Sequence, residues 1–547
     1  MPTPAASAAQ PVGRARLNRS PFRTRRTFRR VPFIHQIQLL PLILGALLTG
    51  MLPGVAAAQS AKALKGHEKE SSARSSTAAE IRASVGGKYK DFYGPRGYWP
   101  LWSKGDAIGP QADALLALLD SAGLDGLDPG RYNPRSLRRL VDEADGSGDP
   151  KLLARADLAL SKALADYVAD VRRPAKDVRI RYLDAELEPK GQDASAVLRA
   201  AALTPSLTDY IKTAGWMSSF YMRLRGARGV YEERWGHLPD VKIPADLKLR
   251  PGSTGAGVPL LRHRLGLGEG AAYDKALTAR VRAFQAAHGL KADGIAGPQT
   301  VIALNRGPDY YERLFALNME RTRLLPGPWV RHVVVDAASA RLWYYGDGAL
   351  DGTMKVVVGA KESQTPMMAG MVRYATLNPY WNIPPDLVER NVAPKILAGG
   401  SLRRMNYEAL SDWSATPARL DQSSIDWSAV AAGRTEARVR QLPGPGNAMG
   451  RVKFMFPNDL GIYLHDTPDR GLFAKPARQY SNGCIRLEDA QRLGKWFFGK
   501  ALAAKSDEPE QHVPLPQPVP VYLTYLTALP TGEGITFLPD VYERDGD

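Results

Sequence analysis

Residues 332–359 read HVVVDAASARLWYYGDGALDGTMKVVVG, and this stretch decides the fold class of the C-terminal part of the chain. It contains runs of β-branched and aromatic side chains that are separated by glycines and polar residues. Such runs predict β-strands joined by turns. Similar texture returns at residues 453–456 and 519–526, so we expect a β-rich domain over residues 325–547.

A polar segment with a helical leaning interrupts this β domain between residues 386 and 450. A Pro/Gly break, LPGPG at residues 442–446, lies near its end. Long insertions inside a compact domain are usually functional. We therefore expect residues 386–450 to form a capping insertion, for instance a lid over a cleft.

Two helical regions are predicted upstream. Between residues 88 and 250, apolar residues recur at the three- and four-residue spacing of helices, as in residues 152–171. This pattern predicts a helical scaffold domain, and the aromatic residues at 98–102 are expected in its core. A smaller unit is predicted at residues 251–306. One helix face there is formed by Leu277, Val281, Phe284 and His288.

The N-terminal segment has the composition of an export signal. Residues 14–30 contain eight arginines and no acidic residue, residues 31–58 carry no charge, and small residues follow at 55–58. A basic, apolar and then small order is typical of a secretory signal peptide. The segment could instead remain as a single inner-membrane anchor. We treat residues 1–58 as a signal or anchor and residues 59–87 as a polar linker, which predicts a periplasmic protein.

Length and composition narrow the class of protein. A chain of 547 residues predicts three or four domains, and 24% charged with 8% aromatic residues is typical of globular proteins. Nearly half of the formal charge of +17 lies in the tract of eight arginines, and the remainder is spread without a dense Lys/Arg block. Nucleic-acid binding is therefore not expected. The residual excess indicates a mild attraction to an anionic polymer such as the cell wall.

The only cysteine, Cys484, is the candidate nucleophile. A single cysteine excludes an intrachain disulfide framework and a Cys-rich metal site. Arg486 places a cation near the thiol, and a helix expected to follow directly would bring its positive dipole end close, so both favour thiolate. Gly483 lets the backbone approach a substrate carbonyl, so the N–H groups of Gly483 and Cys484 are the expected oxyanion hole.

His465, at the end of a strand-like segment, is the candidate general base. It could take the thiol proton and later protonate a leaving amine. Consecutive strand residues point to opposite faces, so we expect a backbone carbonyl, rather than the Asp466 side chain, to orient the imidazole. The motifs G-x-S-x-G, S-x-x-K with K-T-G, and H-E-x-x-H are absent, and the other histidines form no metal-ligand pairs. No metal or cofactor is predicted.

These motifs carry a family resemblance. HDTP at residues 465–468, with Leu472-Phe473, Arg478 and SNGCIR at 481–486, resembles the signature of L,D-transpeptidase catalytic domains. Segments 356–359, 365–366 and 377–385 resemble the large, multidomain periplasmic members of that family. The stretch VRAFQAAHGL at 281–290 and DGIAGPQT at 293–300 resembles the helical peptidoglycan-binding domain of bacterial wall enzymes.

The resemblance implies a multidomain α+β fold. Its parts would be a helical scaffold domain, a small three-helix peptidoglycan-binding domain, and a β-rich catalytic domain with a helical capping insertion. It also implies a reaction in which Cys484 attacks the bond between the diamino acid and the terminal D-Ala of a peptidoglycan tetrapeptide stem. D-Ala leaves, and the acyl group passes to the side-chain amine of a second stem. Carbapenems acylate the family at this cysteine.

The resemblance assigns further residues to the site. His465 would be the base, and Tyr463 and Arg486 would orient the site or the substrate. The matching motifs add further substrate-binding candidates, namely Ser481, Asn482, Trp381 and Asn382. Many members have histidine where this chain has Asn482, so we expect an orienting or lining role at that position.

Two other functions fit the same sequence. An L,D-carboxypeptidase would pass the acyl group to water instead of an amine. A non-catalytic scaffold would use residues 251–306 to bind the wall. The predicted partners are peptidoglycan stem peptides and glycan, with the inner membrane possible through residues 31–58.

Overall fold

The computed structural model describes residues 71–173, 178–531 and 534–546. The export segment predicted for residues 1–58 lies outside this range. Residues 71–84, which the sequence analysis assigned to a linker, are helical. Thr77 and Ile81 lie on one side of this helix and are buried, as is Val85 directly after it, so a helix face packs where the polar composition predicted a linker. None of the described helices is long and apolar enough to cross a membrane.

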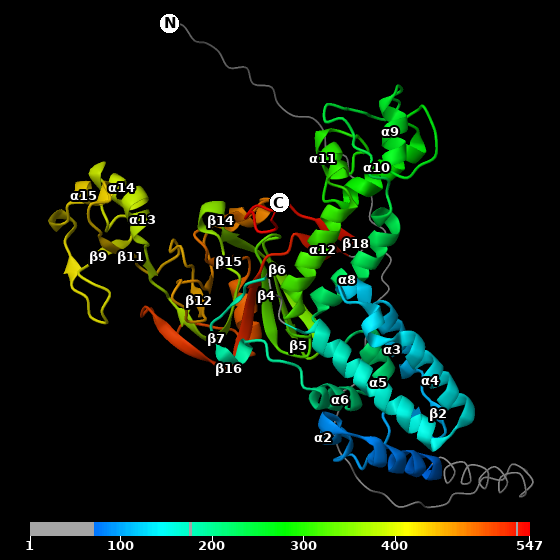
Figure 1. Cartoon of the computed structure of the whole chain (residues 1–547). Coiled ribbons are helices and arrows are strands. Elements are labelled where there is room, and N and C mark those ends of the chain that lie inside the picture. Colours follow the sequence, from blue (N-terminus) through cyan, green and yellow to red (C-terminus); the bar gives the residue numbers. More distant parts are fainter. Residues whose placement is uncertain (1–70, 174–177, 532–533, 547) are drawn as a thin grey trace, which may run out of the picture. The chain divides into compact units, whose positions relative to one another are not determined.

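The described residues up to residue 236 are mainly helical (blue to green in Figure 1), as predicted. Its helices are α2 (Lys90–Tyr93), α3 (Gln111–Asp120), α4 (Pro134–Ser147), α5 (Pro150–Val171), α6 (Ala194–Ala202), α7 (Leu207–Lys212) and α8 (Ser219–Tyr231), the last continued by a π-helical turn (Glu232–Gly236). Short strands accompany them, β1 (Ser103–Lys104), β2 (Ala107–Ile108) and β3 (Arg181–Tyr182).

Two buried aspartates organise this helical core. Asp157 on α5 accepts the backbone N–H groups of Leu101 and Trp102 at 2.8 and 2.7 Å, and it accepts the Tyr93 hydroxyl. These bonds explain why Trp102 is fixed in the core, where it is fully buried, whereas Trp99 is 37% exposed, contrary to the expectation for residues 98–102. Asp125 accepts the hydroxyls of Tyr167 and Tyr221 at 2.7 and 2.9 Å, and the Arg225 guanidinium at 2.9 Å.

The predicted three-helix unit is present in residues 251–306. Its helices are α9 (Gly257–Arg264), α10 (Lys275–Ala287) and α11 (Pro298–Arg306), and helix α12 (Pro308–Arg323) follows. Asp274 caps α10 by accepting the Leu277 N–H at 2.8 Å, and Pro298 begins α11. The helix face predicted from the sequence is buried, and it includes His288. Burial lowers the pKa of His288 to about 3.

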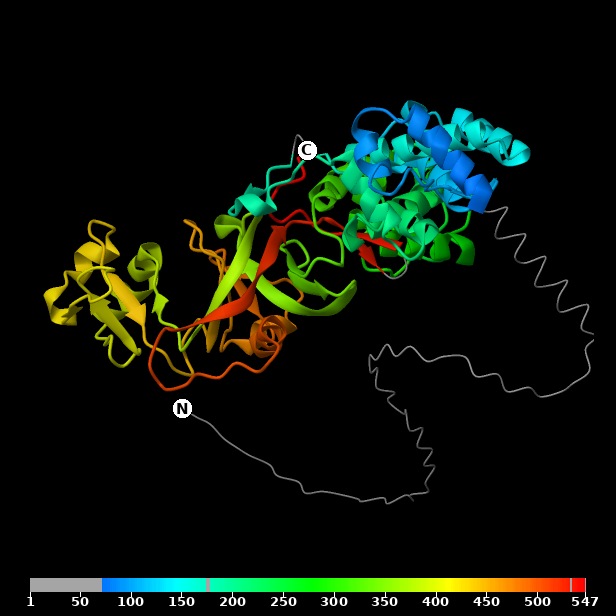
Figure 2. The same ribbon diagram turned by 90° about the horizontal axis from the view of Figure 1, so that it is seen from below.

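The β-rich domain is built on one large sheet. Its strands are β4 (His332–Asp336), β5 (Arg341–Gly346), β6 (Ala349–Gly359), β7 (Met368–Leu377), β12 (Val452–Met455), β13 (Leu464–His465), β14 (Gln479–Ser481), β15 (Ile485–Leu487) and β16 (Gln511–Thr524). The strand order is β12-β13-β15-β6-β5-β4-β16-β7-β3, with β14 on β6. Strand β12 also pairs with β7, so the path closes on itself. The long pairing of β7 with β16 is visible in Figure 2.

Both faces of this sheet are covered, which explains the continuous apolar run at residues 332–335. Val333 and Val335 belong to a core that helix α16 (Ala490–Phe498) shares, whereas Val334 belongs to a core on the opposite face. On that opposite face Phe220 of α8 packs edge-on against Trp343, with ring centroids 4.9 Å apart. Strands buried on both faces lose the alternation of apolar and polar residues.

The insertion is not purely helical, which corrects the expectation of a helical cap. Short helices α13 (Pro385–Leu387), α14 (Ala393–Leu397) and α15 (Trp427–Ala431) accompany a sheet of four strands (yellow in Figure 1). The strands are β8 (Trp381–Asn382), β9 (Tyr407–Leu410), β10 (Arg419–Leu420) and β11 (Arg438–Gln441). These strands have two to four residues, too short for the alternation that reveals a strand in sequence.

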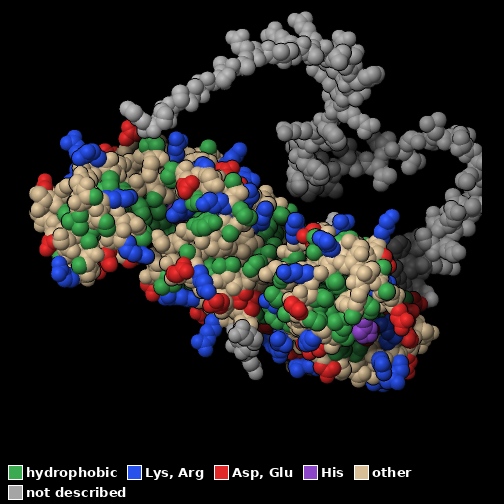
Figure 3. Space-filling view, turned by 90° about the horizontal axis from the view of Figure 1, so that it is seen from above, with side chains coloured by type: hydrophobic (Ala, Val, Ile, Leu, Met, Phe, Trp, Pro, Cys, Tyr) green, Lys and Arg blue, Asp and Glu red, His purple; other side chains and the backbone are tan. Residues whose placement is uncertain are grey.

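The charged side chains of the described residues are intermixed on the face shown in Figure 3, where blue and red groups alternate over the surface. Many of them pair, for example Arg181 with Asp459 at 2.8 Å and Lys361 with Glu543 at 2.6 Å. On this face no single-sign surface of the kind that binds nucleic acid is apparent.

Candidate active site

The candidate nucleophile and base lie on neighbouring strands. Strands β13 and β15 run parallel, with Leu464 beside Ile485 and His465 beside Arg486. Cys484 directly precedes β15, and Tyr463 directly precedes β13, so these two residues are also adjacent. The Tyr463 ring lies edge-on to the His465 ring, with centroids 5.7 Å apart. The sheet therefore brings together Cys484, Tyr463, His465 and Arg486, which the sequence placed nineteen or more residues apart across the two strands.

The His465 imidazole is buried and held in one orientation. Its Nδ1 lies 2.6 Å from the Asp466 carbonyl oxygen, so Nδ1 carries the proton and donates it. This confirms the expectation that a backbone carbonyl orients the ring, and it leaves Nε2 as a free acceptor. The Asp466 carboxylate instead accepts the Arg451 N–H at 2.9 Å and pairs with Arg470 at 2.6 Å. Burial, followed by the charges of Arg486 and Lys453, lowers the pKa of His465 to about 3.

The Cys484 thiol is neutral at rest. Burial raises its pKa to about 11, although interactions with Tyr463 and the charges of Arg486 and Lys453 act in the opposite direction. The thiol donates to the Gly461 carbonyl oxygen, with Sγ at 3.3 Å. The resting pair therefore consists of a thiol and a neutral imidazole over the physiological pH range.

The expected helix dipole does not act on Cys484, which corrects the sequence analysis. The cysteine is followed by strand β15, and helix α16 begins only at Ala490. The Asp489 side chain accepts the Arg492 N–H at 2.9 Å at that helix end. Leu487, which a helix directly after Cys484 would have included, lies in the strand. Thiolate is therefore favoured by hydrogen bonds from Tyr463, followed by the charges of Arg486 and Lys453, rather than by a helix terminus.

A turn at residues 481–484 presents the cysteine. Ser481 Oγ accepts the Gly483 N–H at 3.2 Å and donates to the Cys484 carbonyl oxygen at 2.5 Å. The Gly483 N–H is therefore already engaged, which leaves the Cys484 N–H as the better oxyanion donor. Gly483 has φ of +107°, and its carbonyl oxygen accepts the Thr365 hydroxyl at 2.7 Å.

The loop that holds this turn is clamped by residues far downstream. We call residues 540–545 the C-terminal clamp. Tyr542 donates its hydroxyl to the Gly359 carbonyl oxygen, and Arg544 donates to Gln364 Oε1 and to the Thr365 carbonyl oxygen at 2.9 and 3.0 Å. At the other end of the clamp, Asp545 pairs with Arg321 of α12 at 2.7 Å in a buried ion pair. The position of the Gly483 carbonyl thus depends on the clamp through Thr365.

Three cationic or polar groups complete the surroundings of the pair. Arg486 is half-buried, and its Nε is a buried atom that has no hydrogen-bond partner among the described residues. Lys453, on β12, lies beside His465 on the other side of the imidazole. The Lys453 ammonium is 5.8 Å from the Tyr463 ring centroid. Burial raises the pKa of Tyr463 well above its usual value, so the phenol stays neutral.

Three predicted substrate-binding residues lie apart from the group formed by Cys484, Tyr463, His465 and Arg486, or at its edge. Trp381 and Asn382 form β8 and pair with β11 in the sheet of the insertion, where Trp381 packs on the insertion core. Asn382 is exposed there. Asn482 lies in the turn beside Cys484 with its side chain exposed. Within the described residues, no group of three or more His, Cys, Asp or Glu side chains is arranged to hold a metal ion.

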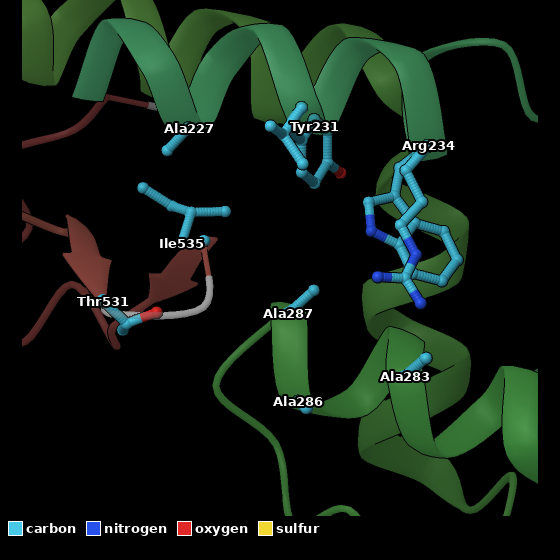
Figure 4. A pocket seen from close by; sticks show the side chains of 11 residues that line it. Ala227, Tyr231, Arg234, Ala283, Ala286, Ala287, Thr531 and Ile535 are labelled. Carbon is cyan, nitrogen blue, oxygen red and sulfur yellow. The ribbon is translucent and has the colours of Figure 1, made fainter. Parts of the chain in front are cut away.

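A separate pocket of about 290 Å³ lies between α8, α10 and the hairpin of β17 (Ala528–Thr531) and β18 (Gly534–Phe537). Figure 4 shows Arg234 extending beside Tyr231 on one wall, with Ala283 and Ala287 on the opposite wall. The residues that line it include none of the predicted catalytic residues. The pocket is therefore separate from the candidate catalytic residues and is lined by helices and by one β-hairpin.

Sequence reasoning missed Lys453, Thr365 as a support of the turn, and the C-terminal clamp. Lys453 stands between the buried Val452 and Phe454, so alternation alone placed it on the opposite side of the strand from the core. This alternation was the one signal in the sequence that could have identified Lys453 as a site residue. Thr365 and the clamp carry no such pattern, because their partners are more than a hundred residues away in sequence.

A Gly483→Ala substitution should disturb the turn. The added Cβ would lie 3.0 Å from Ile462 Cδ1, and φ of +107° is unfavourable for alanine, at a cost of about 1–3 kcal/mol. We expect acylation of Cys484 by a carbapenem, followed by mass spectrometry, to slow at least tenfold. Gly499→Ala is the matched control, because Gly499 has φ of +70° with open space around it. Equal effects of the two substitutions on acylation would contradict the role of the turn.

Family comparisons support three domains in this chain. Residues 87–227 match the model of a "Scaffold domain", residues 263–304 match a "Putative peptidoglycan binding domain", and residues 330–503 match the "L,D-transpeptidase catalytic domain". A curated protein of Haemophilus influenzae named "Putative L,D-transpeptidase" is 33% identical over 238 residues. The match covers 42% of this chain and 47% of that protein, so the chain spans about half the length of this relative.

Solved structures of L,D-transpeptidases are also similar to this chain. The enzyme from Xylanimonas cellulosilytica is 19% identical over 51% of this chain and 98% of its own, with a TM-score of 0.18. The enzyme from Mycobacterium smegmatis is 11% identical over 35% and 58%, with a TM-score of 0.18. Scores this low carry no argument, so the assignment rests on the family models and the curated relative. The chain therefore combines regions that match a scaffold domain, a putative peptidoglycan-binding domain and an L,D-transpeptidase catalytic domain.

Proposed function

We propose that this protein is a peptidoglycan L,D-transpeptidase in which Cys484 is the nucleophile and His465 the general base. One observation carries the proposal. The only cysteine of the chain directly precedes β15, and on the parallel neighbour β13 a neutral histidine has its Nδ1 fixed by a carbonyl and its Nε2 free. A thiol beside an oriented base is the arrangement that acyl transfer through a thioester requires.

The first half of the reaction follows from these groups. Cys484 Sγ forms a bond to the carbonyl carbon that joins the diamino acid to the terminal D-Ala, while the thiol proton moves to His465 Nε2. The Cys484 N–H is the proposed donor to the oxyanion, because the Gly483 N–H is held by Ser481. The C–N bond then breaks, His465 returns the proton to the leaving amine, and D-Ala departs from a thioester.

The second half of the reaction uses the same base in reverse. The side-chain amine of a second stem attacks the thioester carbonyl, and His465 Nε2 accepts a proton from this amine. The C–S bond breaks, and the proton returns to the Cys484 sulfur, so the enzyme is restored. The positive charge of Arg486, which lies beside His465 on β15, is suited to attract a substrate carboxylate toward the cysteine. The insertion is the proposed cap over the bound stems, and the periplasm is the proposed location.

The test is incubation of the purified protein with disaccharide-tetrapeptide, followed by mass spectrometry of the products. Cross-linked dimers that have lost D-Ala would support the transpeptidase. Tripeptide monomers alone would show that water is the acceptor, as in an L,D-carboxypeptidase. Unchanged substrate together with no carbapenem adduct at Cys484 would leave a wall-binding scaffold as the function.

The pH profile of acylation should be nearly flat between pH 5 and 8. A pKa of about 3 keeps His465 able to accept a proton throughout this range, and a pKa of about 11 keeps Cys484 a thiol throughout it. An ordinary histidine with a pKa near 6.5 would lose about 25-fold in its neutral fraction from pH 7 to pH 5. Rate constants for carbapenem acylation, measured by stopped flow, should change less than about threefold. A tenfold rise per pH unit would show attack by a free thiolate instead.

A further inference from the structure

A second cation, Lys453, flanks the catalytic pair opposite Arg486. In the antiparallel pair of β12 and β13, Lys453 is directly opposite His465, and in the parallel pair of β13 and β15, His465 is beside Arg486. Residues that are opposite each other on adjacent strands project from the same face of a sheet. The His465 imidazole therefore lies between the Lys453 ammonium on one neighbouring strand and the Arg486 guanidinium on the other. Tyr463 and Cys484 lie two residues earlier, directly before β13 and β15, on the same face of the sheet.

The Lys453 ammonium is fixed in place. Its Nζ is 3.2 Å from Glu510 Oε1 and 3.4 Å from the Tyr380 carbonyl oxygen. The Lys453 side chain is only 13% exposed. Glu510 is itself oriented, because its Oε1 also accepts the Tyr380 N–H at 2.7 Å and its own N–H donates to the Asn378 carbonyl oxygen at 3.0 Å. Because these contacts hold the Lys453 ammonium in one position, its electrostatic effect on neighbouring groups does not vary with side-chain motion.

We infer that Lys453, oriented by Glu510, is a positioning residue that favours thiolate at Cys484 and neutral imidazole at His465 from the neighbouring strand. This inference deepens the proposed function, because it concerns the nucleophile and base on which that function rests. It assigns no contact with substrate to Lys453. Its test is independent of turnover, so the two can fail separately.

The charges around the pair explain the direction of the effect. The groups that face it are Tyr463 and His465 from β13, Arg486 from β15, Lys453 from β12 and Glu510 before β16, with Asp469 facing Arg486. A positive charge favours thiolate over thiol and neutral imidazole over imidazolium. Lys453 accordingly lowers the pKa of both Cys484 and His465, against burial at the cysteine and together with burial at the histidine.

The two cations affect the proton that His465 takes from Cys484 and later gives to the leaving amine. When His465 has taken the thiol proton, the imidazolium stands between two cations and is therefore a strong acid. It returns the proton readily to the leaving amine, which is the step that releases D-Ala. A packing role alone does not require the charge, because an apolar side chain fills a half-buried position without the cost of desolvating an ion.

The experiment measures the alkylation rate of Cys484 by iodoacetamide at fixed pH 8. Because Cys484 is the only cysteine of the chain, labelling reports this thiol alone. Lys453→Met should slow labelling roughly 3- to 10-fold, because the thiolate fraction falls by that factor. Glu510→Gln should accelerate it about threefold, since the amide keeps a hydrogen-bond acceptor for Lys453 while it removes the compensating negative charge.

Two control variants separate charge from structure. Lys453→Arg keeps the charge and should label within about twofold of the wild-type rate. Lys355→Met removes a lysine from β6 of the same sheet, whose Nζ binds the Phe473 carbonyl oxygen instead, and should also label at the wild-type rate. The inference is overturned if Lys453→Met labels at the wild-type rate, or if Lys453→Met and Glu510→Gln shift the rate in the same direction.

A failed proposed function has a different signature. In that case the labelling rates would still respond to Lys453 and Glu510, whereas no variant and no wild-type protein would release D-Ala from disaccharide-tetrapeptide. If Lys453→Met proves too unstable to label, Glu510→Gln and Lys453→Arg still test the inference, because acceleration by the first and a wild-type rate for the second are both required.

Discussion

A Cys484→Ala variant should form no covalent carbapenem adduct and should release no D-Ala from disaccharide-tetrapeptide, a loss of roughly 10⁴-fold or more. The physical reason is that the thioester cannot form without the sulfur, and the chain has no second cysteine to replace it. Mass spectrometry of the intact protein measures the adduct, and product analysis measures the release. We expect both to be lost together.

The fold should survive this substitution. The thiol donates to the Gly461 carbonyl oxygen and interacts with Tyr463, whereas the turn is held by Ser481 and Thr365. The thermal midpoint of Cys484→Ala should therefore stay close to that of the wild-type protein. A variant that keeps its fold and still releases D-Ala would contradict the assignment of Cys484 as the nucleophile.

An Asp125→Ala variant should lower the free energy of unfolding by about 3–5 kcal/mol, because it removes one partner of a buried ion pair. Asp125 is almost fully buried and accepts hydrogen bonds from Arg225 and from two phenols, those of Tyr167 and Tyr221. After the substitution the guanidinium would remain as an uncompensated charge, and both hydroxyls would lose their acceptor. Urea denaturation followed by circular dichroism measures the change.

Two companion variants test the cause of this instability. Asp125→Asn keeps an acceptor for the phenols and should recover part of the loss. Asp113→Ala removes an exposed carboxylate that lies 3.9 Å from Arg138 at the surface, and it should leave the unfolding midpoint unchanged. If Asp125→Ala unfolded at the wild-type urea concentration, the buried cluster would not stabilise the helical domain.

Local patterns in the sequence were sufficient to predict several parts of this structure. The β-branched runs at residues 332–359 predicted the large sheet, and the helix face that ends at His288 predicted the three-helix unit. The strand alternation around Asp466 predicted that a carbonyl orients His465, and the structure confirms it. Each of these inferences depends on residues within a few positions of one another.

The parts that were missed depend on partners distant in sequence. The Thr365 hydroxyl reaches Gly483 and the Arg544 guanidinium reaches Thr365, and neither pair has a local pattern. The expected helix after Cys484 was wrong by a few residues, since a three-residue strand precedes α16. Because of this small displacement the helix dipole does not act on Cys484, and Arg486 and Lys453 are the sources of positive charge near the thiol.

The C-terminal clamp makes the turn at Cys484 depend on residues that are synthesised after it. A ribosome produces Cys484 well before residues 540–545, and a growing chain that lacks them cannot make the hydrogen bonds that fix Thr365 and, through it, the Gly483 carbonyl. We therefore expect the turn that presents Cys484 to be held less firmly in a chain that ends before residue 540.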